Sequence, residues 1–349
     1  MKLNYRPEID GLRFLAVMSV VFYHAKIYIN NFLIFEGGYI GVDIFFVISG
    51  YLITFIILNE LKKKSKFNFL NFYDKRIRRI IPALLIVMIV SFPFAWLYLL
   101  PGAFIEYSKS ILYSLGFSSN FFFLYSGQLY GADSSLLKPF LHTWSLSVEE
   151  QFYILYPLFL YLTYKFFRKF IFVILIIFFF LSLFLAEWLS NFHPQINFYV
   201  FPTRAWELIA GALLAYLEVF NKNKVIFKKF NNFILFLSFA ILFFSLMFFD
   251  ENTKHPSLIT LLPVIATCVI ISIGNNKNLL IKFLSNKIFV GIGLISYSLY
   301  LWHFPIFSFA RIIGLEENNI LLKLGLIILS IGLSIITYFF IEQPARRKK

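Results

Sequence analysis

Charged side chains are scarce in this chain, and the scarcity excludes an ordinary soluble protein. Lys, Arg, Asp and Glu make up 14% of the 349 residues, whereas hydrophobic residues make up 60%. Soluble domains carry roughly 25% charged residues, so this surface does not face mostly water. Cysteine is scarcer still. The single Cys268 excludes an internal disulfide and a cysteine zinc site.

Long apolar runs are what the sequence has in abundance. A run of about 20 apolar residues crosses a bilayer core as a helix, and such runs recur along the whole chain. No small-residue cleavage pattern follows the first run, which indicates a retained span rather than a signal peptide. The predicted fold class is an all-α integral membrane protein, with residues 1–349 in one transmembrane domain. We predict ten transmembrane helices, near residues 10–28, 39–58, 80–99, 148–164, 170–187, 200–218, 231–249, 257–273, 288–310 and 321–341.

The basic residues predict the topology. The formal charge is +14, yet Lys and Arg occur in short clusters between apolar runs, as in cytoplasmic loops, and do not suggest a nucleic-acid partner. If this chain is a multi-pass inner-membrane protein with ten spans and both termini in the cytoplasm, 24 of its 32 basic residues lie on the cytoplasmic side. We predict this topology. An eleventh apolar segment, 103–126, would move 14 of them outside if it crossed. We therefore predict that 103–126 is a re-entrant or interfacial segment on the outer side.

The first predicted span carries two ionisable side chains that a membrane helix does not keep without a reason. Arg13 and His24 are eleven residues apart, so they face directions only about 20° apart and lie ~16 Å from each other along the helix. Asp10 falls on nearly the same stripe. This geometry suits a long substrate with its anionic end inward. Alternatively, Arg13 snorkels to the interface and His24 bonds a neighbouring backbone group.

Later spans also carry ionisable side chains. Asp43 lies near the outer end of the second span, at a depth close to that of His24. A carboxylate beside an imidazole fixes its tautomer and raises its basicity, although Asp43 is equally suited to a helix cap or an ion pair. For His303, in the outer half of its span, we favour a structural role. Arg204 and Glu207 are one helical turn apart, which predicts an ion pair, with sugar contact as the second reading of Arg204.

The outer end of the fourth span gathers further polar groups. His142 precedes it, and Glu149 and Glu150 follow at its start. Adjacent carboxylates on a helix diverge by about 100°, so we expect one to face a cavity and the other to stabilise the helix start. Trp144 fits either an interfacial aromatic belt or a platform for a sugar ring.

A basic cluster comes just before the third span. It contains Lys75, Arg76, Arg78 and Arg79. Such a cluster sets topology or contacts anionic lipid by default. Planar guanidinium groups also recognise phosphate, so the cluster is a candidate for the nucleotide end of a coenzyme.

Six sequence blocks together resemble the acyltransferase-3 family of membrane O-acyltransferases, which includes O-antigen and other surface-glycan acetylases. Each block is weak alone, but the six occur in order over nearly the full chain, which makes the match specific. The blocks are Tyr5–Arg13 with His24, Gly41–Ile53, Phe72–Pro82, His142–Tyr153, Ser296–His303 and Ile341–Arg346.

The resemblance implies a ten-span helical acyltransferase that takes an acyl group, usually acetyl, from cytoplasmic acyl-CoA. It delivers the group to a hydroxyl on the outer side. In this family the residues matching Arg13 and His24 are tied to activity, and those matching Arg76 and Arg79 to coenzyme handling. Some relatives carry an esterase-like domain after the last span. This sequence stops at Lys349, so we expect any second transfer step outside to need a separate protein.

The resulting hypothesis places the acyl-CoA phosphates near Arg76, Arg78 and Arg79, with the thioester near His24. His24 acts as general base, oriented by Asp43, or carries the acyl group transiently. Acyl-CoA is the expected co-substrate, and no metal is expected. Acceptor contacts are assigned to His142, Trp144, Glu149, Glu150, Arg204 and His303.

The acceptor class stays open at this point. A glycan or lipid-linked glycan is expected, and lipopolysaccharide O-antigen, capsule, exopolysaccharide and peptidoglycan all fit, while the oligomeric state is not readable. A transporter, or a flippase or polymerase of lipid-linked sugars, is the alternative from another class, because many spans and buried charges also mark transporters.

Overall fold

The computed structural model describes residues 5–30, 32–128, 134–220, 231–274, 278–315 and 319–347, and these residues are almost entirely helical. One short hairpin pairs β1 (Tyr28–Ile29) with β2 (Phe32–Leu33). The α-helices are α1 (Pro7–Ala25), α2 (Gly41–Lys64), α3 (Phe69–Tyr98), α4 (Pro101–Leu115), α5 (Ser119–Ser126), α6 (Thr143–Phe166), α7 (Ile171–Phe192), α8 (Pro194–Tyr199), α9 (Phe201–Phe220), α10 (Asn231–Phe248), α11 (Leu261–Ile273), α12 (Leu279–Leu284), α13 (Lys287–Leu294), α14 (Ser296–Ile312), α15 (Ile320–Thr337) and α16 (Gln343–Arg347). The short 3-10 helices are η1 (Gly38–Ile40), η2 (Ser135–Leu137) and η3 (Arg168–Phe170), and η4 (Tyr338–Glu342) is a short π-helix.

The all-α prediction is confirmed, and each of the ten predicted spans overlaps a helix or, for 288–310, the successive helices α13 and α14. Four helical stretches are long and apolar enough to cross a membrane, and α13 with α14 makes a fifth if taken as one broken span. The count of ten therefore stays a prediction. α1 and α9 are not among these stretches, because each carries three charged side chains. Four of these six side chains, Asp10, Arg13, Arg204 and Glu207, are ones that the sequence analysis singled out.

The segment 103–126 is not one long helix. It divides into α4 and α5 at Gly116–Ser118, where Phe117 adopts a left-handed conformation with φ 50°. A helix broken in this way does not cross as a single straight span, which agrees with the topology argued from charge. Its position relative to the lipid stays a prediction.

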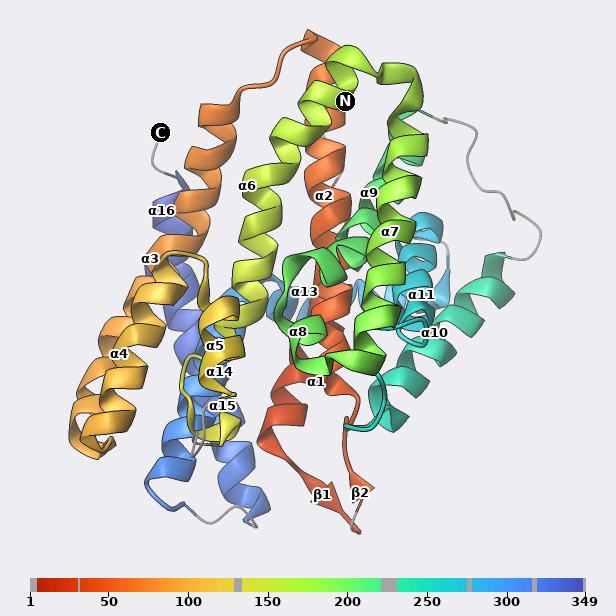
Figure 1. Ribbon diagram of the computed structural model, residues 1–349. Coiled ribbons are helices and arrows are strands. Elements are labelled where there is room, and N and C mark those ends of the chain that lie inside the picture. The colour runs from red at the N-terminus through yellow and green to blue at the C-terminus, as the bar shows by residue number, and fades with distance from the viewer. Residues whose placement is uncertain are drawn as a thin grey trace. The chain divides into compact units, whose positions relative to one another are not determined.

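The helices group into two compact units. The first comprises Met1–Tyr23, Ile34–Phe67 and Gln151–Leu294, and the second comprises His24–Leu33, Asn68–Glu150 and Ile295–Lys349. The division falls within α1 and within α6. In the first unit α2 packs along α9, and α9 along α7 (Figure 1).

Close backbone contact joins α2 and α9. A Cβ atom added to Gly50 would lie 1.8 Å from the Leu208 carbonyl oxygen, and one added to Gly211 would lie 2.0 Å from that of Val47. Only glycine fits at both positions. Small residues that let membrane helices approach closely supply the packing that holds such bundles together. This contact positions Asp43 on α2 and Arg204 on α9.

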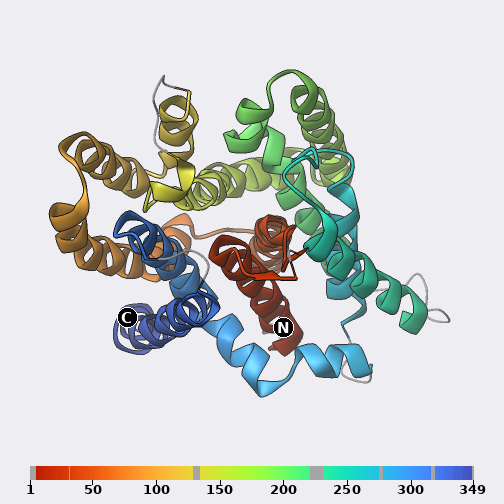
Figure 2. The same cartoon turned by 90° about the horizontal axis from the view of Figure 1, so that it is seen from below.

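The second unit is organised around α14. This helix packs against α3 and α15, and α14 lies beside α15 both in Figure 1 and from below in Figure 2. Two buried polar bonds tie it in place, since Trp302 Nε1 donates to Thr337 Oγ1 at 2.8 Å and Ser298 Oγ donates to Glu342 Oε2 at 2.9 Å. His303 directly follows Trp302 on α14.

Candidate active site

Three of the five histidines gather in the second unit. The ring centroids of His24 and His303 are 5.5 Å apart, and those of His142 and His303 are also 5.5 Å apart. Phe304 closes the group, with its ring edge-on to His24 at 4.8 Å and stacked on His142 at 5.3 Å. We call His24, His142 and His303 the histidine cluster. Its members come from the end of α1, the turn before α6 and the middle of α14.

The hydrogen bonding of His303 defines its tautomer. Its Nδ1 lies 3.2 Å from the carbonyl oxygen of Leu299, so Nδ1 carries a proton and donates it. In a neutral ring the other nitrogen, Nε2, is then a free acceptor. Among the described residues Nε2 has no hydrogen-bond partner, although His303 is fully buried. The ring therefore presents an unoccupied lone pair inside the cluster.

The backbone carbonyl of His142 accepts two hydrogen bonds. Tyr300 Oη donates to the His142 carbonyl at 2.9 Å, and Ser145 Oγ donates to the same carbonyl at 3.2 Å. Neither ring nitrogen of His142 has a hydrogen-bond partner among the described residues, and the residue is 2% exposed. Buried polar groups are usually paired, so an imidazole fixed in this manner needs a functional explanation.

His24 differs from the other two because it is partly exposed. It lies one residue before the C-terminal end of α1, and its carbonyl oxygen accepts a hydrogen bond from Arg311 Nη2. Earlier on the same helix, Arg13 Nη1 donates to Asp10 Oδ1 at 2.9 Å. The predicted stripe of Asp10, Arg13 and His24 thus contains an ion pair. Its role as a path for a substrate stays a prediction.

The first unit holds a second buried polar group, which we call the ion cluster: Asp43, Arg204, Glu207 and His255. Arg204 Nη1 donates to Asp43 Oδ1 and to Glu207 Oε1, each at 3.2 Å. The contact between Arg204 and Glu207 confirms their predicted ion pair, and both side chains are fully buried. Complete burial of the guanidinium favours this structural role of Arg204 over contact with a sugar.

His255, which the sequence alone did not single out, completes the ion cluster. Its Nε2 lies 2.9 Å from Asp43 Oδ2, and its Nδ1 lies 3.3 Å from Arg204 Nη2. One consistent tautomer donates from Nε2 to the carboxylate and accepts from the guanidinium at Nδ1. Burial, and then the charge of Arg204, lower the pKa of His255 well below its ordinary value, which agrees with a neutral ring.

The ion cluster also resembles a metal-ligand set. Ligand atoms of Asp43, Glu207 and His255 lie within 4.8 Å of one another. Arg204 Nη1 is within 3.2 Å of an atom of each of them. The single guanidinium thus occupies the position between the two carboxylates where a cation would bind. The contacts of Asp43 are with Arg204 and His255, and its predicted pairing with His24 stays a prediction.

The arginines of the basic cluster on α3 make different contacts. Arg78 Nε donates to both oxygens of Asp74, at 2.8 and 2.9 Å, in a largely exposed pair. The Arg76 guanidinium lies over the Phe72 ring, 5.7 Å from its centroid. Arg79 forms no ion pair within the described ranges. Exposed pairs contribute little stability, so Arg78 can exchange its carboxylate partner for a phosphate at small cost.

The two adjacent glutamates of α6 face different surroundings, as their spacing predicts. Glu150 is 5% exposed and Glu149 is half-buried. Arg76 and Arg79 are close enough to act electrostatically on the Glu150 carboxylate. Trp144 is buried, and its predicted contact with a sugar is untested.

The apolar helices define a multi-pass membrane protein, and the histidine cluster is an arrangement suited to proton or acyl transfer. The chain belongs to the acyltransferase family described as "Acyltransferase domain", whose model matches residues 6–339. The predicted family and the predicted class of enzyme are therefore confirmed.

Similar curated proteins are O-acetyltransferases. The chain is 31% identical to the peptidoglycan O-acetyltransferase OatA of Listeria monocytogenes, over 99% of this chain and 56% of that protein. It is 33% identical to the O-acetyltransferase OatA of Staphylococcus aureus, over 99% of this chain and 58% of that protein. The chain thus spans little more than half the length of these relatives. No solved structure matches it significantly.

Proposed function

We propose that this protein is a membrane O-acyltransferase that moves an acetyl group from cytoplasmic acyl-CoA to a hydroxyl of a cell-surface glycan. The observation that carries the proposal is the histidine cluster, which groups the partly exposed residue His24 with the buried His142 and His303, three of whose ring nitrogens have no hydrogen-bond partner among the described residues. An imidazole that a substrate can reach is the side chain most often used for general acid–base catalysis. The family assignment favours this activity over the transporter alternative.

The chemistry needs one proton to move twice. His24 takes the proton of the acceptor hydroxyl as its oxygen attacks the thioester carbonyl. The new ester C–O bond forms, the C–S bond breaks, and the proton returns from His24 to the departing thiolate of the coenzyme. Transfer through an acyl-histidine is the variant in which His24 attacks first. The lone pair on His303 Nε2 is a suitable acceptor to orient the His24 ring.

The donor side of the proposal rests on arginines. Arg76 and Arg79 are half-buried and three residues apart on α3, so they present neighbouring charges for the coenzyme phosphates. Arg78 and Arg13 are assigned as further contacts, in exchange for their present carboxylate partners. Because Arg13 precedes His24 by ~16 Å on α1, it suits a group on the pantetheine arm.

The acceptor is proposed from the relatives. One relative is named as a peptidoglycan O-acetyltransferase, which favours a peptidoglycan-type glycan over O-antigen and capsule. His142, Glu149 and Glu150 are retained as candidate acceptor contacts, and Arg204 is better explained by the ion cluster. We place the protein in the cell membrane with both termini cytoplasmic, because the basic loops favour that orientation.

The test uses purified protein in nanodiscs with acetyl-labelled acetyl-CoA and peptidoglycan glycan strands. We expect label in the strands as base-labile O-acetyl ester, together with an equal amount of free coenzyme A. Release of coenzyme without label in any glycan would contradict the acceptor. Absence of both, with folded protein, would contradict the activity itself.

A further inference from the structure

A group of buried hydroxyls in the second unit joins α4 and α5 to the start of α6, directly after His142. Thr143 Oγ1 lies 2.7 Å from Ser114 Oγ on α4 and 2.9 Å from Ser119 Oγ on α5. Ser119 Oγ lies 2.8 Å from Ser147 Oγ, one turn further along α6. All four residues are buried. We call these four hydroxyls the hydroxyl network.

The helices α4 and α5 also contact the residues that precede His142. Lys138 Nζ lies 3.3 Å from Glu106 Oε2 on α4. The Phe140 ring packs against the Tyr107 ring of α4, with their centroids 5.6 Å apart. Contacts from α4 and α5 thus occur four and two positions before His142 and one position after it. We call residues 138–142 the His142 turn.

The face of α4 that is buried in the protein is polar. Its buried residues are Tyr107, Ser110 and Ser114. Leu112, which is offset from Ser114 by about 200° on the helix, is exposed. Ser114 Oγ can donate to the Ser110 carbonyl, which is 2.7 Å away on its own helix. Burial of Ser114 therefore does not by itself require a partner such as Thr143.

The position of the His142 ring depends on this turn. The ring stacks on that of Phe140, with the centroids 6.3 Å apart, and it also packs on Phe304 of α14. The His142 carbonyl accepts a hydrogen bond from Tyr300 Oη of α14. The turn is thus held by α14 at His142 itself, and by α4 and α5 at the residues around it.

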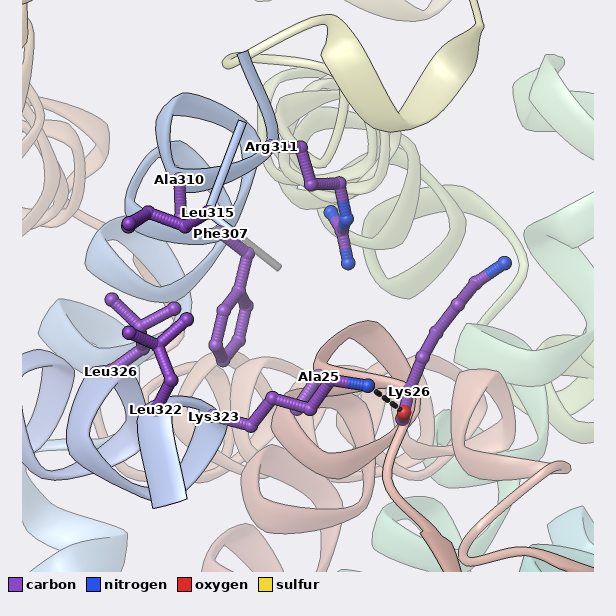
Figure 3. A pocket seen from close by; sticks show the side chains of 9 residues that line it. All are labelled: Ala25, Lys26, Phe307, Ala310, Arg311, Leu315, Leu322, Lys323 and Leu326. Carbon is purple, nitrogen blue, oxygen red and sulfur yellow. Dashed lines mark hydrogen bonds between the residues drawn. The ribbon is translucent and has the colours of Figure 1, made fainter. Parts of the chain in front are cut away.

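His24 is held at its backbone in a comparable way. Arg311 Nη2 of α14 donates to the His24 carbonyl, and Lys323 Nζ of α15 donates to the carbonyl of Lys26, two residues later. Figure 3 shows Lys323 reaching the end of α1 from α15, with its bond to Lys26 drawn as a dashed line. Two members of the histidine cluster are therefore fixed at or near their backbone by elements that are distant in sequence.

We infer that Thr143 is a positioning residue for acetyl transfer, through which α4 and α5 hold the His142 turn. The inference rests on the proposed function, in which His142 contacts the acceptor. Groups that contact a substrate must be held accurately, since a displacement of about 1 Å costs about 10²-fold in rate. Thr143 acts through the backbone that it shares with His142. A hydroxyl that only joined α6 to α4 and α5 would leave acceptor binding unchanged.

The experiment compares Thr143→Val and Thr143→Ser with the wild type in nanodiscs. Valine keeps the shape of threonine but removes the hydroxyl, whereas serine keeps the hydroxyl. Thr163→Val is the matched control, because Thr163 is a buried threonine of the same helix whose hydroxyl donates to the Phe159 carbonyl within that helix. For each protein we would measure kcat, KM for acetyl-CoA, KM for peptidoglycan glycan strands, and thermal unfolding.

We expect Thr143→Val to raise KM for the glycan roughly tenfold, because the hydrogen bonds that place His142 are lost. KM for acetyl-CoA should not change, and thermal unfolding should match that of Thr163→Val. Thr143→Ser should restore the wild-type KM. A wild-type KM for the glycan in Thr143→Val would overturn the inference. So would a fall in kcat alone, because loss of folded protein lowers kcat and leaves both KM values unchanged.

A double variant tests whether Thr143 acts through His142. In His142→Phe the contact with the acceptor is already lost, so adding Thr143→Val should raise KM for the glycan no further. Effects of the two substitutions that multiply would show that Thr143 acts independently of His142, and would also overturn the inference.

Labelling with diethyl pyrocarbonate tests the same support without turnover. His142 is buried, so we expect it to react several-fold faster in Thr143→Val than in Thr163→Val, because the turn opens more often. Equal rates would contradict the support of the turn by Thr143. Failure of the wild type to acetylate any glycan would count against the proposed function, and the labelling rates would still decide whether Thr143 holds the turn.

Discussion

Two buried polar clusters, one in each unit, pair their groups to very different degrees. In the ion cluster, Asp43, Arg204, Glu207 and His255 bond one another. In the histidine cluster, both ring nitrogens of His142 and Nε2 of His303 lack partners among the described residues. Leaving a buried polar group unpaired costs about 1–3 kcal/mol, so it persists only where something else requires it.

The comparison suggests that the ion cluster stabilises the fold and that the histidine cluster serves the reaction. Side chains that bond one another fix the crossing of α2 and α9, and their loss should harm the fold. Imidazoles that lack partners are available to a substrate, and their loss should harm activity. The following predictions are ordered by the size of the expected effect.

Replacing His24 should give the largest effect. His24→Gln keeps a polar side chain but removes the base, and general-base catalysis contributes on the order of 10²–10⁴-fold. We expect the initial rate of acetyl transfer to fall about 10³-fold, with thermal unfolding unchanged. His193→Gln, at an exposed histidine outside both clusters, should keep the wild-type rate. A His24→Gln rate close to that of this control would remove His24 from the mechanism.

Removing Arg204 should test the ion cluster. Arg204→Met leaves two buried carboxylates without their cation, and breaking a buried pair in this way costs about 3–5 kcal/mol. The free energy of unfolding, measured by denaturant titration in detergent, should fall by that amount. Adding Asp43→Asn and Glu207→Gln should recover much of it. A loss below about 1 kcal/mol would show that the cluster does not hold α2 to α9.

His303→Phe tests whether a residue of the histidine cluster serves activity and not stability. An aromatic ring of similar shape removes the unpaired Nε2, so we expect stability within about 1 kcal/mol of the wild type or above it. Acetyl transfer should nevertheless fall roughly tenfold to a hundredfold, because we propose that Nε2 of His303 orients the His24 ring, and the variant lacks it. Thermal unfolding and transfer rate measured on the same preparation check both parts. Full activity with reduced stability would show that His303 serves the fold and not the reaction.

The smallest effect concerns pH. The pKa of His255 is lowered in the folded protein, so below about pH 6.5 the unfolded chain binds a proton that the folded chain does not. Its contribution to stability is therefore present above that pH and lost as the pH falls, by up to ~1.4 kcal/mol per pH unit. Thermal unfolding at pH 7.5 and 5.5 should show a weaker pH dependence in His255→Gln. Identical dependence in both proteins would contradict the neutral ring.

The sequence predicts the helices well because a membrane helix must be apolar over a fixed length. Each predicted span overlaps one or two helices, and the break within 103–126 agrees with the prediction that this segment does not cross as one span. The Arg204–Glu207 pair was also predictable, since residues three apart meet on one helix face. These features depend on local spacing.

The clusters themselves could not be predicted from spacing, because their members are far apart in the chain. His24, His142 and His303 converge only through the packing of three helices, and His303 was expected to be structural. His255 pairs with Asp43 across 212 positions and has no motif around it to signal that contact.

The most direct test asks whether the donor reaches His24. Diethyl pyrocarbonate modifies accessible neutral imidazoles, so His24 should react before the buried His142 and His303. Mass spectrometry of the protein in nanodiscs, with and without saturating acetyl-CoA, measures each site. We predict that acetyl-CoA protects His24 while His193 still reacts. Equal modification of His24 in both conditions would contradict a catalytic role for the histidine cluster.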